Sequence, residues 1–270
     1  MLLRCPKCQQ PLLQENHRYL CQNNHSYDIA REGYVNLLLV NQKHSRNPGD
    51  SDDSLTARKA FLEKGYYQPL ADDLVTIVNR LFDDGASFLD AGCGTGYYLG
   101  HLINNADRQL EYYAVDIAKK GVAMTAKKNK NATCFVGSVF HLPFSDESLD
   151  GLMSVFTPYG AEEFYRIIKK GGYVIAVTPG RDHLYQLKSI VYDEVYLNEE
   201  EGYDLPGFRL IDRHNITYEK TLECYQDIET LWRMTPYYHM TYSGNNDRLK
   251  KYESLDTVID FLVTVYRKED

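Results

Sequence analysis

A glycine-rich turn that follows an apolar run constrains the fold of this chain more than any other segment. The turn reads Asp-Ala-Gly-Cys-Gly-Thr-Gly over residues 90–96 and comes directly after Phe88 and Leu89. Glycines let the chain turn sharply and let a ligand approach the backbone. A strand, such a turn and a helix are the repeating pieces of an α/β sheet. The segment therefore predicts an α/β fold with a ligand beside the turn.

Strands and helices alternate from residue 86 onward. We expect strands at residues 88–91, 112–116, 133–136, 151–156 and 173–178, and helices from about residue 97, near 121–128 and at 162–168. Two more strands are expected at 208–211 and 258–266, with a helix at 224–234 between them. This alternation predicts a parallel sheet that is covered by helices on both faces.

The chain before residue 86 divides into three parts. Residues 1–38 are polar and rich in turns, and residues 39–54 read as a linker, because no core-forming side chain occurs between positions 41 and 54. Residues 55–270 then form the larger domain. Its first helix passes through Leu55 and Leu62 and is expected to be capped by Asp53 or Ser54. A second helix follows Pro69.

Charge is unevenly distributed along the sequence. The net charge is −8, but residues 1–48 carry +3 and the remainder −11. An acidic protein is repelled by nucleic acid unless its charges are segregated, so the first segment is the expected contact for a polyanion. No apolar run approaches the roughly 20 residues that a membrane span needs. The start of the chain lacks the pattern of a secretory signal, so we expect a cytoplasmic protein without a membrane partner.

Four potential metal ligands lie close together near the N-terminus. Cys5, Cys8, Cys21 and His25 form the pattern C-x2-C-x12-C-x3-H. Zinc binds four sulfur or nitrogen donors in a tetrahedron, and each short spacing lets one turn present two of them. His17 is an alternative fourth ligand but lies outside the paired spacing. Four protein ligands leave no position for water, so we predict a structural Zn²⁺ site.

The glycine turn favours one class of nucleotide ligand. Its spacing, G-x-G-x-G, differs from the G-x-G-x-x-G that binds a dinucleotide pyrophosphate. Asp90, two residues before Gly92, repels phosphate but suits a cation. Asp116 follows Gly96 by 20 residues and ends the next strand, where a carboxylate can accept both hydroxyls of a ribose. A ribose with a cationic tail describes S-adenosylmethionine, with Gly94 and Thr95 in the same turn.

At this point the sequence resembles the class I methyltransferases. Ser138 and Val139, after the third strand, look like the segment that flanks adenine in that family. A more specific resemblance is carried by residues 25–38, 45–50, 58–62, 65–70, 90–98 and 178–184. These runs are similar to the bacterial 23S rRNA guanine-N1-methyltransferases that modify hairpin 35, and the similarity extends over most of the chain.

The resemblance implies a class I methyltransferase Rossmann-like sheet, mostly parallel with an antiparallel last strand, and a small N-terminal zinc-binding domain that helps to bind 23S rRNA. It implies a homodimer and adds Tyr67, Thr95, Gly96 and His183 to the residues that bind S-adenosylmethionine. The linker sequence Asn-Pro-Gly-Asp at positions 47–50 favours the guanine on the stem side of hairpin 35, and the neighbouring loop guanine is the alternative.

Guanine chemistry adds a further requirement. N1 carries a proton at neutral pH, so the site needs a base, a donor to O6, or both. Our hypothesis is that Asp50 or Asp53 approaches the base while Arg46 contacts phosphate or O6; the alternative is that all three are solvated loop charges. Four aromatic side chains could stack on an extruded guanine. They are Tyr66, Tyr67, Phe156 and Tyr159.

Two other functions are compatible with parts of the sequence. A methyltransferase acting on a quinone or another metabolite would need zinc only to stabilise the N-terminal segment. The +3 charge of residues 1–48 argues against this function. A zinc ribbon that recruits RNA or protein could instead be attached to an inactive domain. The intact Asp90, three motif glycines and Asp116 argue against that loss of activity.

Overall fold

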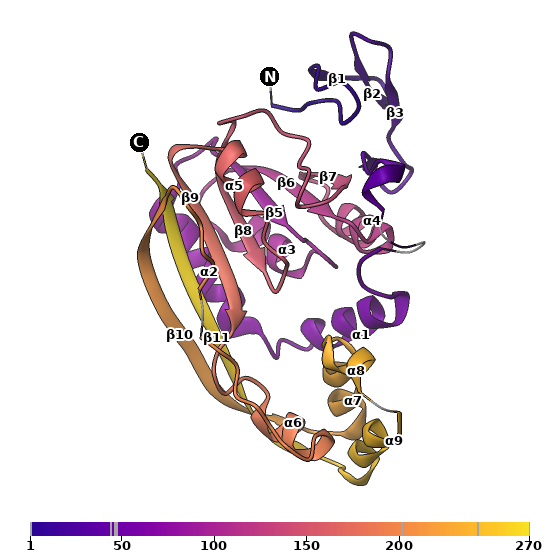
Figure 1. Ribbon diagram of the computed structural model, residues 1–270, viewed down its shortest axis with the longest axis vertical. Coiled ribbons are helices and arrows are strands. Elements are labelled where there is room, and N and C mark those ends of the chain that lie inside the picture. Colours follow the sequence, from indigo (N-terminus) through magenta and orange to yellow (C-terminus); the bar gives the residue numbers. More distant parts are fainter. Residues whose placement is uncertain (1, 44, 46–47, 201, 242, 270) are drawn as a thin grey trace.

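The computed structural model describes residues 2–43, 45, 48–200, 202–241 and 243–269 (Figure 1). In this part of the chain an eight-stranded sheet has the strand order β10-β11-β9-β8-β5-β6-β7-β4. The strands are β4 (Tyr34–Asn36), β5 (Ser87–Ala91), β6 (Glu111–Asp116), β7 (Ala132–Val136), β8 (Leu149–Val155), β9 (Ile168–Pro179), β10 (Phe208–Leu222) and β11 (Leu255–Lys268).

Strand directions confirm the predicted class I methyltransferase sheet. All neighbours from β4 to β9 are parallel, whereas β11 is antiparallel to β9, with Val263 opposite Val177. β10 is antiparallel to β11 and occupies the sheet edge. The carboxyl ends of the parallel strands therefore share one edge, which is where ligands bind in open α/β sheets.

Buried side chains form one core on each face of the sheet. Successive strand residues point to opposite faces, and Phe88 and Leu89 accordingly belong to different cores. The first core receives α2 (Gln68–Leu81), α3 (Tyr97–Asn105) and α4 (Lys119–Lys128). The second receives α5 (Ala161–Ile167) together with Leu3 and Leu12 from the N-terminal segment. The N-terminal segment thus covers sheet area beside α5.

The N-terminal segment contains a three-stranded antiparallel ribbon and one strand of the main sheet. The ribbon consists of β1 (Leu12–Glu15), β2 (Arg18–Cys21) and β3 (Ser26–Asp28). β4, which the sequence pattern did not predict, pairs in parallel with β7, and Val35 lies opposite Phe135. In Figure 1 the ribbon lies at one end of the long axis and the C-terminal helices lie at the other.

The remaining described elements are helices. After the short 3-10 helix η1 (Val40–Gln42), α1 (Asp52–Glu63) begins at Ser51, whose side chain accepts a hydrogen bond from the Ser54 backbone N–H. The expected cap, Asp53 or Ser54, was therefore wrong, because both residues lie inside the first turn. The C-terminal elements are α6 (Tyr185–Val191), α7 (Tyr225–Arg233), α8 (Tyr237–Met240), α9 (Ser243–Asn246) and η2 (Asp247–Lys251). None of the described helices is both long enough and apolar enough to cross a membrane.

Candidate active site and metal centre

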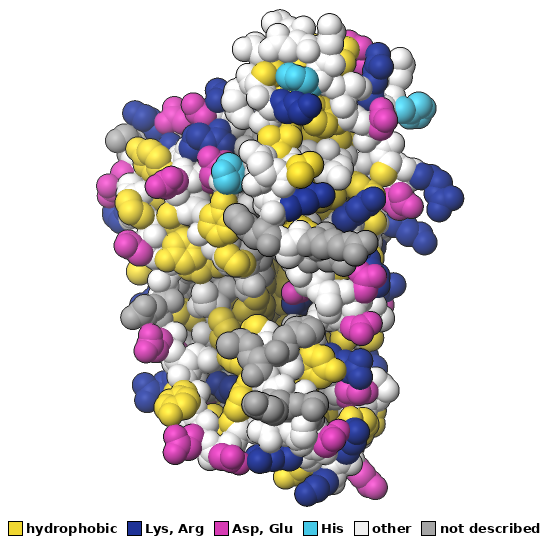
Figure 2. Space-filling model, turned by 45° about the vertical axis from the view of Figure 1, so that its right-hand side comes forward, with side chains coloured by type: hydrophobic (Ala, Val, Ile, Leu, Met, Phe, Trp, Pro, Cys, Tyr) yellow, Lys and Arg dark blue, Asp and Glu magenta, His cyan; other side chains and the backbone are white. Residues whose placement is uncertain are grey.

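A cleft of about 1320 Å³ lies at the carboxyl edge of the parallel strands. Its walls come from the glycine turn, the segment after β7, the end of β8, the linker, the residues before β1 and the segment that contains Met234 and Tyr237. Figure 2 shows a hollow across the middle of one face, with hydrophobic side chains inside it. Small-molecule pockets usually measure roughly 300–1000 Å³. The cleft therefore has room for a nucleoside cofactor and part of a substrate.

The glycine turn is held in a shape that requires glycine. The φ angles of Gly92, Gly94 and Gly96 are +88°, +49° and +71°, which are unfavourable for residues with a side chain. A Cβ on Gly92 would lie 2.1 Å from the Thr157 hydroxyl oxygen, and one on Gly96 would lie 2.7 Å from an Asn129 nitrogen. Gly92 and Thr95 line the cleft, whereas Gly96 does not line it and begins α3.

Two carboxyl groups flank the turn. Asp90 is 3% exposed, lines the cleft and forms no hydrogen bond through its carboxyl group within the described residues. Burial, followed by repulsion from Asp116, raises the pKa of Asp90 to about 8. The Asp116 carboxylate instead accepts hydrogen bonds from the backbone N–H groups of Gly94 (2.8 Å) and Ala118 (2.7 Å). A cation placed in this cleft would relieve the repulsion between the two acids.

The other predicted cofactor residues line the same cleft. Tyr67 directly precedes α2, Ser138 and Val139 follow β7, and His183 follows β9. Nδ1 of His183 accepts a hydrogen bond from the Asp260 backbone N–H (3.2 Å), so in the neutral ring Nε2 carries the proton and faces the Tyr67 hydroxyl at 3.4 Å. Burial lowers the pKa of His183 to about 3, which keeps the ring neutral at physiological pH.

Aromatic side chains occupy the end of β8. Phe156 has a φ of +54°, is 40% exposed and lines the cleft, with its ring centroid 5.9 Å from that of His183. Tyr203 stacks on Tyr159 at 4.0 Å, and its hydroxyl donates to the Thr157 carbonyl oxygen (2.8 Å). Tyr66 points elsewhere, because its hydroxyl donates to the buried Asp227. Phe156 is therefore the predicted stacking residue that is best exposed to the cleft.

The structure separates the three linker residues considered for catalysis. Asp50 lines the cleft and forms an ion pair with Arg58, which also donates to the Met234 carbonyl oxygen (3.1 Å). Asp53 is exposed on the first turn of α1 and lies outside the cleft lining. Arg46 lies outside the described residues.

The four potential zinc ligands converge on one point. Their ligand atoms lie within 4.8 Å of one another, with Nδ1 of His25 3.5 Å from the sulfurs of Cys5 and Cys21 and with 3.7 Å between the sulfurs of Cys8 and Cys21. A tetrahedron with Zn–S near 2.3 Å and Zn–N near 2.0 Å has edges of roughly 3.5–3.8 Å. A backbone hydrogen bond from Gln10 lowers the pKa of Cys8 to about 6, which favours its thiolate. These donors therefore fit zinc.

Comparison with known families assigns both parts of the chain. The family described as "RlmA, N-terminal", a zinc ribbon, matches residues 3–46, and the family described as "Methyltransferase domain" matches residues 89–176. A Streptomyces fradiae protein named 23S rRNA (guanine(748)-N(1))-methyltransferase is 35% identical over 188 residues, which are 68% of this chain and 66% of that protein. A Micromonospora griseorubida protein named for 23S rRNA guanine-N1 methylation is 33% identical over 68% of each chain. The chain belongs to the 23S rRNA (guanine-N1)-methyltransferase family.

The family similarity extends to nearly the whole chain. A Bacillus subtilis protein, YxjB, named for the same activity, is 28% identical over 99% of this chain and 97% of its own length. Among solved structures, that of MccD protein has a TM-score of 0.50 at 14% identity and covers 74% of this chain and 98% of its own, which supports the fold. The methyltransferase domain and the zinc ribbon confirm the expected cofactors, S-adenosylmethionine and Zn²⁺.

The donor set of the cleft fits that cofactor. The buried carboxyl group of Asp90, which has no hydrogen-bond partner among the residues that the structure describes, lines the cleft beside the glycine turn and would hold a cationic group there. Asp116 ends β6, as a ribose-binding acid does in this family of folds. Several cleft residues were not predicted from the sequence, including Arg58, Tyr203 and three residues before β1 in the zinc-ribbon match, Arg4, Pro6 and Gln9. They come from distant segments, and no local pattern marks them.

Proposed function

We propose that this chain transfers a methyl group from S-adenosylmethionine to N1 of a guanine in hairpin 35 of 23S rRNA. The observation that carries the proposal is the composition of the cleft. It joins a buried cation-binding carboxyl group, Asp90, to the zinc ribbon that defines the family. The names of the relatives, which specify 23S rRNA guanine N1, support the substrate.

The cleft provides a surface for one extruded base. Phe156 presents its ring between the glycine turn and the segment that contains His183, and base stacking on an aromatic ring is worth about 1–3 kcal/mol. The positive φ of Phe156 and the hydrogen bond from its backbone N–H to Val177 (3.0 Å) hold the residue in the cleft. Extrusion of a base from a hairpin costs a few kcal/mol, which such stacking offsets.

Proton removal from guanine N1 is assigned to Asp50. When bound, S-adenosylmethionine supplies an electrophilic methyl group on a sulfonium. The Asp50 carboxylate would accept the N1 proton, so that the N1 lone pair becomes available to that methyl group. Arg58, which pairs with Asp50, donates to O6 and stabilises the charge that builds there. Positioning two reactants in this way can supply roughly 7–11 kcal/mol of the barrier reduction.

The linker, the charge distribution and the substrate class support three further parts of the proposal. The Asn-Pro-Gly-Asp linker favours the guanine on the stem side of the hairpin. A homodimer would bring together two N-terminal segments that each carry +3, which offsets the acidic remainder during RNA binding. Because the substrate is ribosomal RNA, the expected compartment is the cytoplasm.

Single-turnover methylation of undermethylated 23S rRNA tests the proposal. With tritiated S-adenosylmethionine, label should map to guanine N1 in hairpin 35, where reverse transcription stops at the modified base. Asp50→Ala should slow the reaction by about 10²–10⁴-fold, the range for loss of a general base, and Asp53→Ala is the matched control outside the cleft. Label only in metabolites would refute the substrate, and equal rates for the two variants would refute the role of Asp50.

A further inference from the structure

The segment between β7 and β8 joins the cofactor cleft to the zinc ribbon. Its first half, including Ser138 and Leu142, lines the cleft. Its second half pairs with the start of the chain: the Arg4 backbone N–H donates to the Pro143 carbonyl oxygen (3.0 Å), and the Ser145 backbone N–H donates to the Leu2 carbonyl oxygen (2.8 Å). Residues 138–146, here called the cofactor loop, thus touch both the cofactor site and the segment that leads into the first zinc ligand.

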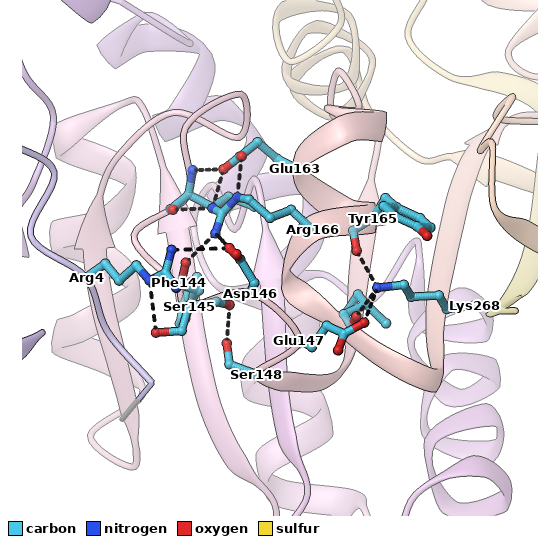
Figure 3. A network of polar contacts seen from close by, with 12 residues as sticks. Arg4, Phe144, Ser145, Asp146, Glu147, Ser148, Glu163, Tyr165, Arg166 and Lys268 are labelled. Carbon is cyan, nitrogen blue, oxygen red and sulfur yellow. Dashed lines mark hydrogen bonds and ion pairs between the residues drawn. The ribbon is translucent and has the colours of Figure 1, made fainter. Parts of the chain in front are cut away.

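An ion pair on α5 holds the middle of the cofactor loop. Glu163 accepts the Leu142 backbone N–H (2.6 Å), and Arg166 donates to the Leu142 carbonyl oxygen (2.9 Å). The two side chains also bond to each other twice, each at 2.7 Å. Both backbone polar groups of Leu142 are therefore hydrogen-bonded to the Glu163–Arg166 ion pair. Arg166 also donates to the Phe144 carbonyl oxygen (2.6 Å). Figure 3 shows Arg166 at the centre of these contacts.

The same arginine is connected to the zinc ribbon. One oxygen of Asp146 accepts from Arg166 (2.9 Å) and from Arg4 (3.3 Å), and Arg4 directly precedes the zinc ligand Cys5. Beside Arg166, at the C-terminal end of α5, the buried Lys268 donates to the carbonyl oxygens of Tyr165 (2.8 Å) and Ile168 (2.9 Å). These bonds satisfy groups that helix ends leave unpaired and hold α5 against β11. The Glu163–Arg166 ion pair therefore lies on a helix that is itself fixed to the sheet.

We propose that Arg166 is a positioning residue for the cofactor loop and that Asp146 couples this loop to the zinc ribbon through Arg4. The inference rests on the proposed function, because it assigns the loop to S-adenosylmethionine. Arg166 touches no reacting atom and acts by fixing the backbone from Leu142 to Phe144. Any ligand that orders the ribbon, such as the rRNA hairpin, then favours cofactor binding, and the effect is reciprocal.

Arg166→Lys tests the positioning role, because lysine keeps the charge but cannot form the planar set of bonds. We expect the dissociation constant for S-adenosylmethionine to rise about tenfold, which corresponds to the loss of one or two hydrogen bonds. The rate at saturating cofactor should change less than about twofold, since the chemistry is untouched. In the cofactor-free state, the backbone amides of residues 138–142 and 144–146 should exchange hydrogen faster in the variant than in the wild type. Arg80→Lys, which alters an exposed ion pair with Asp212, is the matched control.

A double-mutant cycle tests the connection to the ribbon. Arg4→Ala and Asp146→Ala should each weaken cofactor binding about threefold, and the double variant should lose less than the two single losses combined, because both changes remove the same Arg4–Asp146 ion pair. Zinc content should stay at the wild-type value. Additive losses would overturn the coupling, and equal cofactor affinity of Arg166→Lys and Arg80→Lys would overturn the positioning role. If the wild-type chain binds no cofactor, the proposed function fails together with both.

Discussion

The pKa of Asp90 links cofactor affinity to pH. This carboxyl group is buried, has a pKa of about 8 and faces a cationic cofactor. A cation binds the ionised form, so below pH 8 binding must first remove a proton. The dissociation constant of S-adenosylmethionine should therefore rise tenfold for each pH unit below about 8, and it should be roughly 100-fold weaker at pH 6 than at its plateau.

Asp90→Asn provides the matched comparison. The amide is neutral at every pH, so its affinity should be independent of pH between 6 and 8.5 and no higher than that of the wild type at pH 6. Isothermal titration calorimetry measures both curves, and any titration of the cofactor itself cancels between the two proteins. In buffers of different ionisation enthalpy, the wild type alone should release close to one proton on binding at pH 7.

The same group should destabilise the cofactor-free protein at high pH. A carboxyl group whose pKa is higher in the folded than in the unfolded chain stabilises the fold below pH 4, and this stability is lost as pH rises to about 8. The difference between the ordinary value of 3.8 and about 8 corresponds to at most about 6 kcal/mol. Asp90→Asn should thus be closest to the wild type in melting temperature near pH 4, and it should unfold at a higher temperature than the wild type at pH 8.5. Parallel pH curves for the two proteins would refute the reasoning.

Three other perturbations have defined outcomes. Elemental analysis should first find one zinc per chain. Removal of that zinc by a chelator should unfold the ribbon, and it should lower the melting temperature of the whole chain because Leu3 belongs to the core of the sheet. Gly92→Ala should destabilise the chain by roughly 2–5 kcal/mol in urea unfolding, because strain adds to a clash with Thr157. Gly65→Ala should lose only about 1–2 kcal/mol, because its φ is also positive (+77°) but an added Cβ would meet no atom of the described residues within 4 Å. Phe156→Leu should raise the KM for RNA without changing cofactor affinity, whereas equal effects on both would contradict the stacking role.

Local sequence was enough to predict the parallel strands but not the sheet edges. The strands from β5 to β9 are apolar runs bounded by turns, and the sequence pattern predicted each of them. β10 was expected for four residues and has 15, because its largely polar outer part is held by backbone pairing with β11. β4 has three residues and pairs with residues of β7 that lie 100 positions further along the chain. Such pairing depends on tertiary contacts, which no local period encodes.

The cofactor site likewise contains residues that the sequence could predict and residues that it could not. Asp90 and Asp116 could be placed because each lies at the carboxyl end of a strand, and the carboxyl ends of parallel strands share an edge of the sheet. The place of Arg58 in the cleft could not be predicted, because Arg58 is one of several charged residues on its helix. Its role depends on contacts with Asp50 and the Met234 carbonyl group, which only the fold brings near. The segment that supplies Tyr203 lies outside any strand or helix and has no periodic pattern to place it.

The zinc ribbon is best understood as a wall of the active site rather than as a separate attachment. Arg4, Pro6 and Gln9 line the cleft, while Leu3 and Leu12 lie in the core that α5 only partly covers. If the ribbon bound RNA independently on a flexible linker, these apolar side chains would be free of the sheet, and zinc would affect affinity for RNA alone. With the contacts observed, zinc loss exposes one face of the sheet and frees the cofactor loop. Chelation should therefore weaken cofactor binding even in the absence of RNA, and unchanged cofactor affinity would restore the view of two independent parts.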